Sequence, residues 1–340
     1  MGRLAWLVVA IVVVLPTISA AGLALRTGLF LAEFLSDGRW RPLSAVTAEP
    51  QVQPLAARAG ARDIPADLYA SGHPATRPGL ILVHGLSPAG KDDPRLREAA
   101  RLLARAGWAV AVPTVEGLAR FRLRPEDAAA VTAAGRALRA AGAQPIAVLA
   151  VSVGTGPALT AAADPAMAGD VSAMLTLGGY ASARALLRYT LTGDARDLPP
   201  EGRARPDEGA IALFVAANHE LMDAPGQRLA ANREPAAVDA LLAHLPEGSQ
   251  RLLDALSPER YVEGLRAPLF LVHGRDDPAV PVSESRRLAE TAARAGRPTR
   301  LAVVGTVGHV EPGAGTRLAE LARLGALFHA FAATSAGRAP

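Results

Sequence analysis

Short apolar runs that alternate with helical stretches constrain the fold of this 340-residue chain most strongly. Each run is apolar enough for a strand buried on both faces of a sheet. Turn signals lie between them, such as Asp93-Pro94 at a helix start and Gly107 at a helix end. Strands that alternate with helices indicate βαβ units and a parallel sheet. The predicted strands are 79–83, 108–113, 146–151, 171–177, 268–272 and 299–304, preceded by antiparallel candidates at 51–55 and 64–69.

The pentapeptide Ala150-Val151-Ser152-Val153-Gly154 follows the apolar run 146–151 and precedes a run of small and apolar residues at 155–163. This order predicts a strand, a sharp turn and a helix, with Ser152 at the apex. Such a turn exposes the serine hydroxyl, and the residues two before and two after must be small because strand and helix nearly touch there. Ala150 and Gly154 meet that requirement. A serine that only caps a helix is the alternative interpretation.

Two further polar segments follow predicted strands. The segment from His273 to Pro281 follows strand 268–272 and contains both Asp276 and Asp277, and the segment from Gly305 to His309 follows strand 299–304. The carboxyl ends of parallel strands form one edge of a sheet, where open α/β sheets bind their ligands. We therefore expect a serine, a carboxylate and a histidine that are far apart in the sequence to meet at one edge.

With these motifs in order, residues from about 50 to 335 resemble an α/β-hydrolase. The motifs are His84-Gly85 after strand 79–83, the turn at Ser152, the pattern His-Gly-x-x-Asp-x-x-Val-Pro at 273–281, and Gly308-His309. The chain is most similar to the esterase and dienelactone-hydrolase-like group, although dienelactone hydrolases use a cysteine and this chain has none. The resemblance implies an α/β fold with a mostly parallel central sheet flanked by helices.

The resemblance also implies roles for individual residues. Ser152 would be the nucleophile, His309 the general base, and Asp277 the carboxylate that orients the histidine, with Asp276 as the competing candidate. The backbone N–H groups of Val153 and Leu86 would form the oxyanion hole. We expect His84 and His273 to be structural, the first supporting the oxyanion loop and the second lying beneath the acid loop.

The implied activity is hydrolysis of a small-molecule carboxylic ester through an acyl-enzyme on Ser152. A thioester or an amide is the second choice of substrate, and a proline-type peptidase is a further possibility. An acyltransferase with the same triad and a non-catalytic binding protein with the hydrolase fold are the alternatives. No motif indicates a metal or another cofactor.

Residues 4–25 carry no charge, which is long enough for a helix that crosses a bilayer. Residues 1–35 are therefore predicted to be a single-pass membrane anchor, with the side of the catalytic domain left open. Cleavage near Ser19-Ala20-Ala21 would instead make the segment a signal and the protein secreted. The apolar stretch 27–35 is expected to lie at the interface or against the domain.

The rest of the chain divides by its pattern. Residues 36–50 are predicted to be a linker, 51–181 and 267–335 the hydrolase core, and 182–266 a helical insertion that forms a lid. The net charge is only +4, the basic residues are interleaved with acidic ones, and aromatic residues make up 4% of the chain. This composition does not support a nucleic-acid partner.

Overall fold

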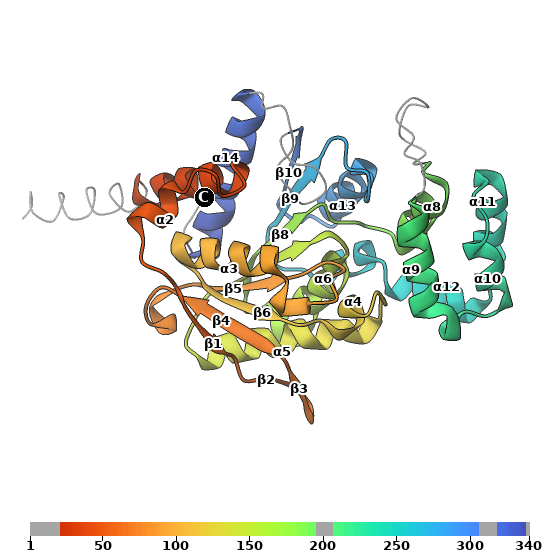
Figure 1. The fold of residues 1–340 in the computed structure, drawn as a ribbon, viewed down its shortest axis with the longest axis horizontal. Helices are drawn as coiled ribbons and strands as arrows, with labels where there is room; N and C mark the ends of the chain where they lie inside the picture. The colour runs from red at the N-terminus through yellow and green to blue at the C-terminus, as the bar shows by residue number, and fades with distance from the viewer. Residues whose placement is uncertain (1–20, 195–206, 306–317, 338–340) are drawn as a thin grey trace, which may run out of the picture.

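Figure 1 shows the computed structural model, which describes residues 21–194, 207–305 and 318–337. Within them, eight strands form one sheet in the order β1-β4-β6-β5-β7-β8-β9-β10. β4 is antiparallel to both of its neighbours, β1 and β6, and every later pair is parallel. The strands are β1 (Gln51–Pro54), β4 (Ala66–Ala70), β5 (Gly79–Val83), β6 (Ala109–Pro113), β7 (Ile146–Val151), β8 (Val171–Leu177), β9 (Leu269–Gly274) and β10 (Thr299–Val304).

The mostly parallel sheet confirms the predicted fold class, but the strand expected at 64–69 is divided. Pro65 has no N–H to donate, so the ladder is interrupted there. β3 (Arg62–Ile64) precedes the proline and pairs with β2 (Ala57–Ala59) in a separate two-stranded hairpin. Gly60 has a φ of +63° in the turn between them. β4 begins only at Ala66, on the other side of the proline.

Helices cover both faces of the sheet. One buried apolar cluster joins the sheet to α3 (Pro94–Ala106), α14 (Leu318–Ser335) and the helical residues 21–35. Another joins it to α5 (Ala128–Ala140), α6 (Thr155–Ala163) and α13 (Val282–Arg294). Figure 1 shows α3 and α5 on opposite sides of β4, β5 and β6. The short helices are α2 (Pro42–Val46), α4 (Glu116–Ala119) and α7 (Pro165–Ala168).

α3 illustrates how local chemistry sets a helix boundary. The Oδ1 atom of Asp93 accepts the backbone N–H of Arg95 at 2.9 Å and that of Leu96 at 3.4 Å, so it satisfies two donors that the first turn leaves unpaired. Pro94 occupies the first helical position, and Gly107, with φ of +125°, ends the helix. These are the boundaries that the sequence predicts.

The second apolar stretch near the N-terminus packs on the domain. Phe30 is only 7% exposed, and its ring stacks on that of Phe328 in α14 at a centroid distance of 4.5 Å. Glu33 is buried and accepts the backbone N–H of Ser44 at 2.9 Å. Most of the predicted anchor at 4–25 lies outside the described residues. Within the described ranges, no helix combines the length and the apolar character needed to cross a bilayer.

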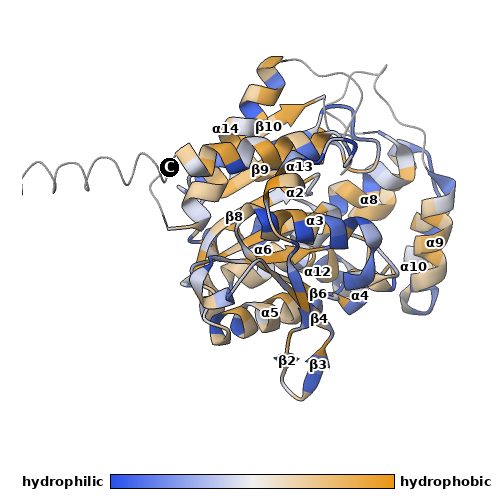
Figure 2. Ribbon diagram, turned by 60° about the vertical axis from the view of Figure 1, so that its left-hand side comes forward, coloured by the Kyte–Doolittle hydropathy of each residue, from blue (hydrophilic) through white to orange (hydrophobic). Residues whose placement is uncertain are grey.

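Helices occupy the described part of the segment between β8 and β9, on the right of Figure 1. They are α8 (Ala183–Thr192), α9 (Glu208–Asn218), α10 (Ala224–Ala230), α11 (Pro235–Ala243) and α12 (Glu247–Ala255). They have an apolar cluster of their own, formed by Leu191, Ile211, Leu229, Val238, Leu242 and Leu245. Figure 2 colours much of α9 as apolar, and Leu213 on that helix is 46% exposed. The segment is therefore a helical subdomain with an apolar cluster of its own.

Candidate active site

Ser152 stands at the junction of β7 and α6. A 3₁₀ turn, Ser152–Gly154, joins the strand directly to the helix. The serine has a φ of +53°, in the left-handed region that costs an L-residue about 1–2 kcal/mol. Strain of this size persists only where the surrounding structure fixes it, and such positions cluster at functional sites. The local geometry is the strand, turn and helix expected from the pentapeptide.

The small residues beside Ser152 are required by close contacts. A Cβ atom on Gly154 would stand 2.4 Å from the carbonyl oxygen of His84, which lies in the segment after β5. A Cβ atom on Gly85 would stand 3.1 Å from the Cβ atom of Ser152. Ala150 is fully buried. The two glycines let the loop after β5 approach the serine closely.

His84 holds that loop in place. Its Nε2 atom accepts the backbone N–H of Val115 at 2.9 Å, so the proton of the neutral ring is on Nδ1, which lies 2.6 Å from the carbonyl oxygen of Gly85. Burial lowers the pKa of His84 below its ordinary value, although the bond to Gly85 opposes that shift. A neutral, fully bonded ring is structural, as expected. The next residue, Leu86, is 42% exposed, and Val153 is 7% exposed.

The acid loop after β9 distinguishes its two aspartates. Asp277 is only 6% exposed, and its Oδ1 atom accepts the backbone N–H groups of Ala279 at 2.8 Å and Val280 at 3.0 Å. Asp276 is exposed. Because the loop closes around the second carboxylate and leaves the first in solvent, Asp277 is the aspartate with a fixed geometry.

His273 lies beneath the acid loop. Its ring is fully buried, with Nδ1 2.6 Å from the hydroxyl of Ser285 and Nε2 2.9 Å from the carbonyl oxygen of Val280. A carbonyl oxygen only accepts, so Nε2 carries a proton. The same nitrogen is 3.4 Å from Oδ2 of Asp277. His273 therefore supports the loop from below, as the sequence suggests.

His309, the predicted base, lies outside the described residues. The structure does describe the strand that leads towards it: β10 ends at Val304, which pairs with Gly274 at the end of β9. β7, β8, β9 and β10 are parallel neighbours, so Ser152 and the acid loop both leave the sheet at its carboxyl edge.

Comparisons with known proteins fit this arrangement. The chain superposes on a puromycin-hydrolyzing peptidase of Mycobacterium tuberculosis with a TM-score of 0.58 and 20% identity over 86% of its length. It superposes on the acylaminoacyl peptidase of Pyrococcus horikoshii with a TM-score of 0.53 and 15% identity over 78% of its length. The chain has the α/β-hydrolase fold. A search of curated proteins finds no match.

Only part of each relative corresponds to this α/β-hydrolase fold. The chain covers 40% of the mycobacterial peptidase and 38% of the Pyrococcus peptidase. Dipeptidyl peptidase 4 of Porphyromonas gingivalis aligns with a TM-score of 0.50 and 15% identity, over 82% of this chain and 35% of that enzyme. The BD-FAE family model matches residues 209–292, which contain most of the helical insertion and the acid loop.

The insertion is tied to the hydrolase core near the acid loop. The hydroxyl of Tyr189 on α8 donates to the carbonyl oxygen of Pro278 at 3.2 Å. Arg188 on α8 is 9% exposed and pairs with Asp239 on α11 at 2.8 Å and with Asp194 at 3.2 Å. The pair with Asp239 joins α8 to α11, and the pair with Asp194 lies just after the C-terminal end of α8.

A cavity of about 1260 Å³ opens at Ser152. Its wall includes Val153 and Leu86, and also the acid-loop residues Pro278, Ala279 and Val280. Most of the remaining wall is apolar and comes from the sheet, from α3 and α14, from helical residues 21–35 and from the insertion. The structure thus brings the serine, both predicted oxyanion residues and the acid loop to the wall of one cavity.

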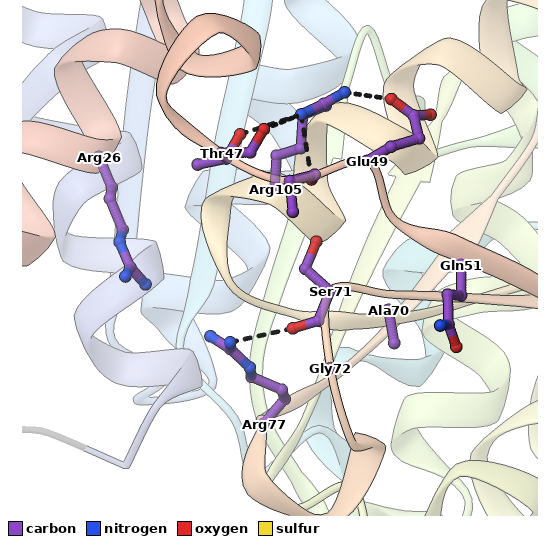
Figure 3. Close-up of a pocket in the computed structure, with 10 residues that line it drawn as sticks. Arg26, Thr47, Glu49, Gln51, Ala70, Ser71, Gly72, Arg77 and Arg105 are labelled. Atoms are coloured by element: carbon purple, nitrogen blue, oxygen red, sulfur yellow. Dashed lines mark hydrogen bonds and ion pairs between the residues drawn. The ribbon is translucent and has the colours of Figure 1, made fainter.

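A second pocket, of about 400 Å³, lies elsewhere and is rich in arginine (Figure 3). Arg105 donates to the carbonyl oxygens of Thr47 at 2.6 Å and Ala48 at 3.0 Å, and it pairs with Glu49. Arg77 donates to the carbonyl oxygen of Ser71 at 3.0 Å. Neither Ser152 nor Asp277 lines this pocket. Arg105 fastens residues 47–49 to α3.

Glu284 is a buried carboxylate that sequence analysis did not single out. It is 2% exposed, and its Oε2 atom accepts the backbone N–H groups of Ala181 at 2.9 Å and Ser182 at 2.8 Å. Burial raises its pKa above the ordinary value for glutamate, although the two donors oppose that shift. It fixes the point where the chain leaves the sheet for the insertion. A carboxylate on the apolar face of a predicted helix was the signal that could have identified it.

Proposed function

We propose that the chain is a serine hydrolase that forms an acyl-enzyme on Ser152 and cleaves a carboxylic ester of a small molecule. The position of the serine carries this proposal. Ser152 has a φ of +53° at the junction of β7 and α6, and it lies on the wall of the 1260 Å³ cavity together with the acid loop. A serine that served only to cap a helix would need neither the strain nor the cavity.

In the proposed reaction, the hydroxyl oxygen of Ser152 attacks the carbonyl carbon of the substrate while His309 takes the hydroxyl proton. The bond to the leaving alcohol breaks, and the alcohol departs with that proton. Water then attacks the acyl-enzyme while His309 takes one of its protons, and His309 passes that proton to the oxygen of Ser152 as the bond to the acyl group breaks and the carboxylic acid leaves. Asp277 orients the imidazole and stabilises its charged form.

The negative charge that develops on the substrate oxygen needs fixed donors. In this proposal, the backbone N–H groups of Val153 and Leu86 supply them, and the positive end of α6 adds to their effect. The hydrogen bonds of His84 support this role, because they hold the loop that carries Leu86 beside the serine.

An ester is preferred over a peptide because of the cavity wall. A peptide brings amide groups that need hydrogen-bond partners when they are buried, and each unpaired group costs several kcal/mol. Most of the wall is apolar. The peptidase names of the structural relatives favour an amide as the second candidate substrate, so both bond types belong in the test.

The test compares Ser152→Ala with Ser249→Ala, a substitution of another serine on the cavity wall. Labelling by a fluorophosphonate probe and hydrolysis of matched p-nitrophenyl ester and p-nitroanilide substrates are measured. We expect Ser152→Ala to lose labelling and ester hydrolysis, and Ser249→Ala to keep both. Labelling of Ser152→Ala at the wild-type rate would show that the nucleophile is elsewhere.

Two alternative functions give different results in the same experiments. An acyltransferase with the same triad would convert an added alcohol to a new ester, which product analysis detects. A non-catalytic binding protein would leave every activated ester and the probe unreacted.

We also propose the membrane as the location, from the uncharged run at 4–25. Release of the full-length chain from membranes by high salt would contradict an anchor.

A further inference from the structure

The cavity at Ser152 has two regions with different walls. The first, the lid region, is lined by the helical insertion, for example by Leu186, Ile211 and Leu229. The second, the sheet-face region, is lined by Leu82, Leu149 and Leu175 of the sheet, by Ala99 and Leu103 of α3, by Phe328 of α14 and by Phe30 of the helical residues 21–35. Ser152 is on the wall of the same cavity, so both regions connect with the proposed nucleophile.

The sheet-face region begins next to the serine. Val151 and Leu149 precede Ser152 on β7 and point to the same face of the sheet, because side chains alternate along a strand. Leu149 is three residues before the serine, which places it about 10 Å back along the strand. Neighbouring strands contribute Leu82 and Leu175 to the wall of the same cavity. The strands therefore present an apolar wall to a chain attached to Ser152.

Helical residues 21–35 cover this path. Phe30 stacks on Phe328 at 4.5 Å, and both belong to the cluster that contains Leu103 and Leu149. Phe34 and Leu31 on the same helix also line the cavity. The N-terminal segment thus completes the wall, and the space lies between it, α3, α14 and the sheet rather than under the insertion.

The chemistry of this region suits a hydrocarbon chain. The strands and α14 line this region with aliphatic and aromatic side chains, which offer no partner for an amide, a hydroxyl or a charge. Charged side chains such as Glu33, Arg41 and Glu98 also line the cavity, from the N-terminal part of the chain and α3. Burial of one methylene strengthens binding about fourfold. A zigzag chain with bonds of about 1.5 Å advances roughly 1.3 Å per carbon, so about eight carbons reach Leu149. The volume of about 1260 Å³ belongs to the whole cavity, both regions together, and exceeds the roughly 300–1,000 Å³ of ordinary ligand pockets.

We propose that the substrate carries a long unbranched acyl chain, which lies in the sheet-face region with its carbonyl carbon at Ser152. The inference rests on the proposed serine hydrolase and names its substrate class: esters of fatty acids with about ten or more carbons. The leaving alcohol occupies the lid region. The N-terminal segment, which covers the acyl chain, is then part of the substrate site.

The test uses the full-length protein and p-nitrophenyl esters with acyl chains of four, eight, twelve and sixteen carbons. Ala99→Phe places a ring in the sheet-face region. Ala106→Phe is the matched control, because Ala106 is a partly buried alanine on the same helix that packs against the same cluster but does not line the cavity. We expect wild-type kcat/KM to be at least about tenfold higher for twelve carbons than for four.

Ala99→Phe should lower kcat/KM for the twelve-carbon ester at least about tenfold and leave the four-carbon ester within about twofold. Ala106→Phe should change neither. The inference is overturned if wild-type kcat/KM does not depend on acyl-chain length. It is also overturned if Ala99→Phe lowers kcat/KM equally for both esters while Ala106→Phe does not. Either result leaves the hydrolase proposal intact.

A binding measurement separates failure of the inference from failure of the proposed function. A fluorescent fatty acid is titrated into Ser152→Ala, with and without Ala99→Phe. The acyl site is supported if binding is saturable and Ala99→Phe lowers the affinity at least about tenfold. If this holds and no ester reacts, only the hydrolase proposal fails. Absence of binding, or equal binding by both variants, contradicts the acyl site whatever the activity.

Discussion

Replacement of Gly154 by alanine tests the close approach on which the turn at Ser152 depends. The added Cβ atom would stand 2.4 Å from the carbonyl oxygen of His84 and 3.1 Å from that of Val83. Real contacts of this kind are essentially never shorter than 3.0 Å, so the backbone must move by at least about 0.6 Å. Gly154 has φ of −59° and ψ of −16°, which alanine adopts without strain, so any loss of stability comes from the steric contact.

The size of the effect follows from the rigidity of the neighbouring loop. His84 is held at both ring nitrogens, so its carbonyl cannot move without disturbing those hydrogen bonds. Overpacking of a well-packed interior costs about 1–3 kcal/mol. Alanine also lowers the conformational entropy of the unfolded chain, which stabilises the folded state by about 0.4–1 kcal/mol. We therefore expect Gly154→Ala to lower the free energy of unfolding by about 1–2 kcal/mol and to slow hydrolysis, because the loop that carries Leu86 moves.

Gly169→Ala is the matched control. Gly169 also has a helical conformation, with φ of −76° and ψ of −23°, and an added Cβ atom there would meet nothing within 4 Å. Its unfolding free energy should stay level or rise by about 0.4–1 kcal/mol. Chemical denaturation of both variants and the wild type, with one probe of secondary structure, gives the comparison. If the two variants are equally stable, the loop after β5 does not approach Gly154 as closely as the structure shows, and our account of the turn is wrong.

Two further predictions concern buried carboxylates. Asp277→Asn should lower kcat for ester hydrolysis about 10³- to 10⁴-fold, because the carboxylate that orients the histidine is lost. Asp276→Asn changes an exposed residue, and its kcat should stay within about twofold of the wild type. The reverse order would assign the role to Asp276. Burial raises the pKa of Glu284 in the folded chain, so the folded state holds the proton more tightly than the unfolded state does. The stabilisation from this protonation is complete below the unfolded pKa of about 4.3, and it is lost as the pH rises through the higher folded pKa. Glu284→Gln cannot titrate and should not show this loss of stability. The free energy of unfolding of the wild type, relative to that of the variant, should therefore drop between pH 4 and pH 8. A constant difference in denaturation midpoints over this range would contradict the reasoning.

Much of the core was predictable because its signals are local. The apolar runs at 79–83 and 171–177 identify strands by composition alone, and Asp93-Pro94 marks a helix start by hydrogen bonding within one turn. The hairpin β2–β3 was missed because its strands are three residues long and carry little periodicity. The division at Pro65 was visible in the sequence, since proline cannot donate to a ladder.

The candidate site was predictable in part. The sequence ranks Asp277 above Asp276 by motif position, and the structure adds that the loop buries one carboxylate and leaves the other exposed. The roles of Ser152, Asp277, Leu86 and Val153 in catalysis remain predictions, as does that of His309. The sequence predicted that the stretch 27–35 lies at the interface or against the domain, but it did not indicate that Phe30 packs on Phe328 and lines the cavity, because that depends on which segments pack together.

By itself, the sequence determined the order of strands and helices along the chain, the sharp turn at Ser152 and the residue types that follow each strand. These features depend on side-chain periodicity and backbone preference over a few neighbouring residues. Only the tertiary structure decided the strand order in the sheet, the burial of Glu284 and the cover that residues 21–35 place over α3 and α14. Those features come from contacts between residues tens to hundreds of positions apart, such as Phe30 and Phe328, and no local pattern records such a contact.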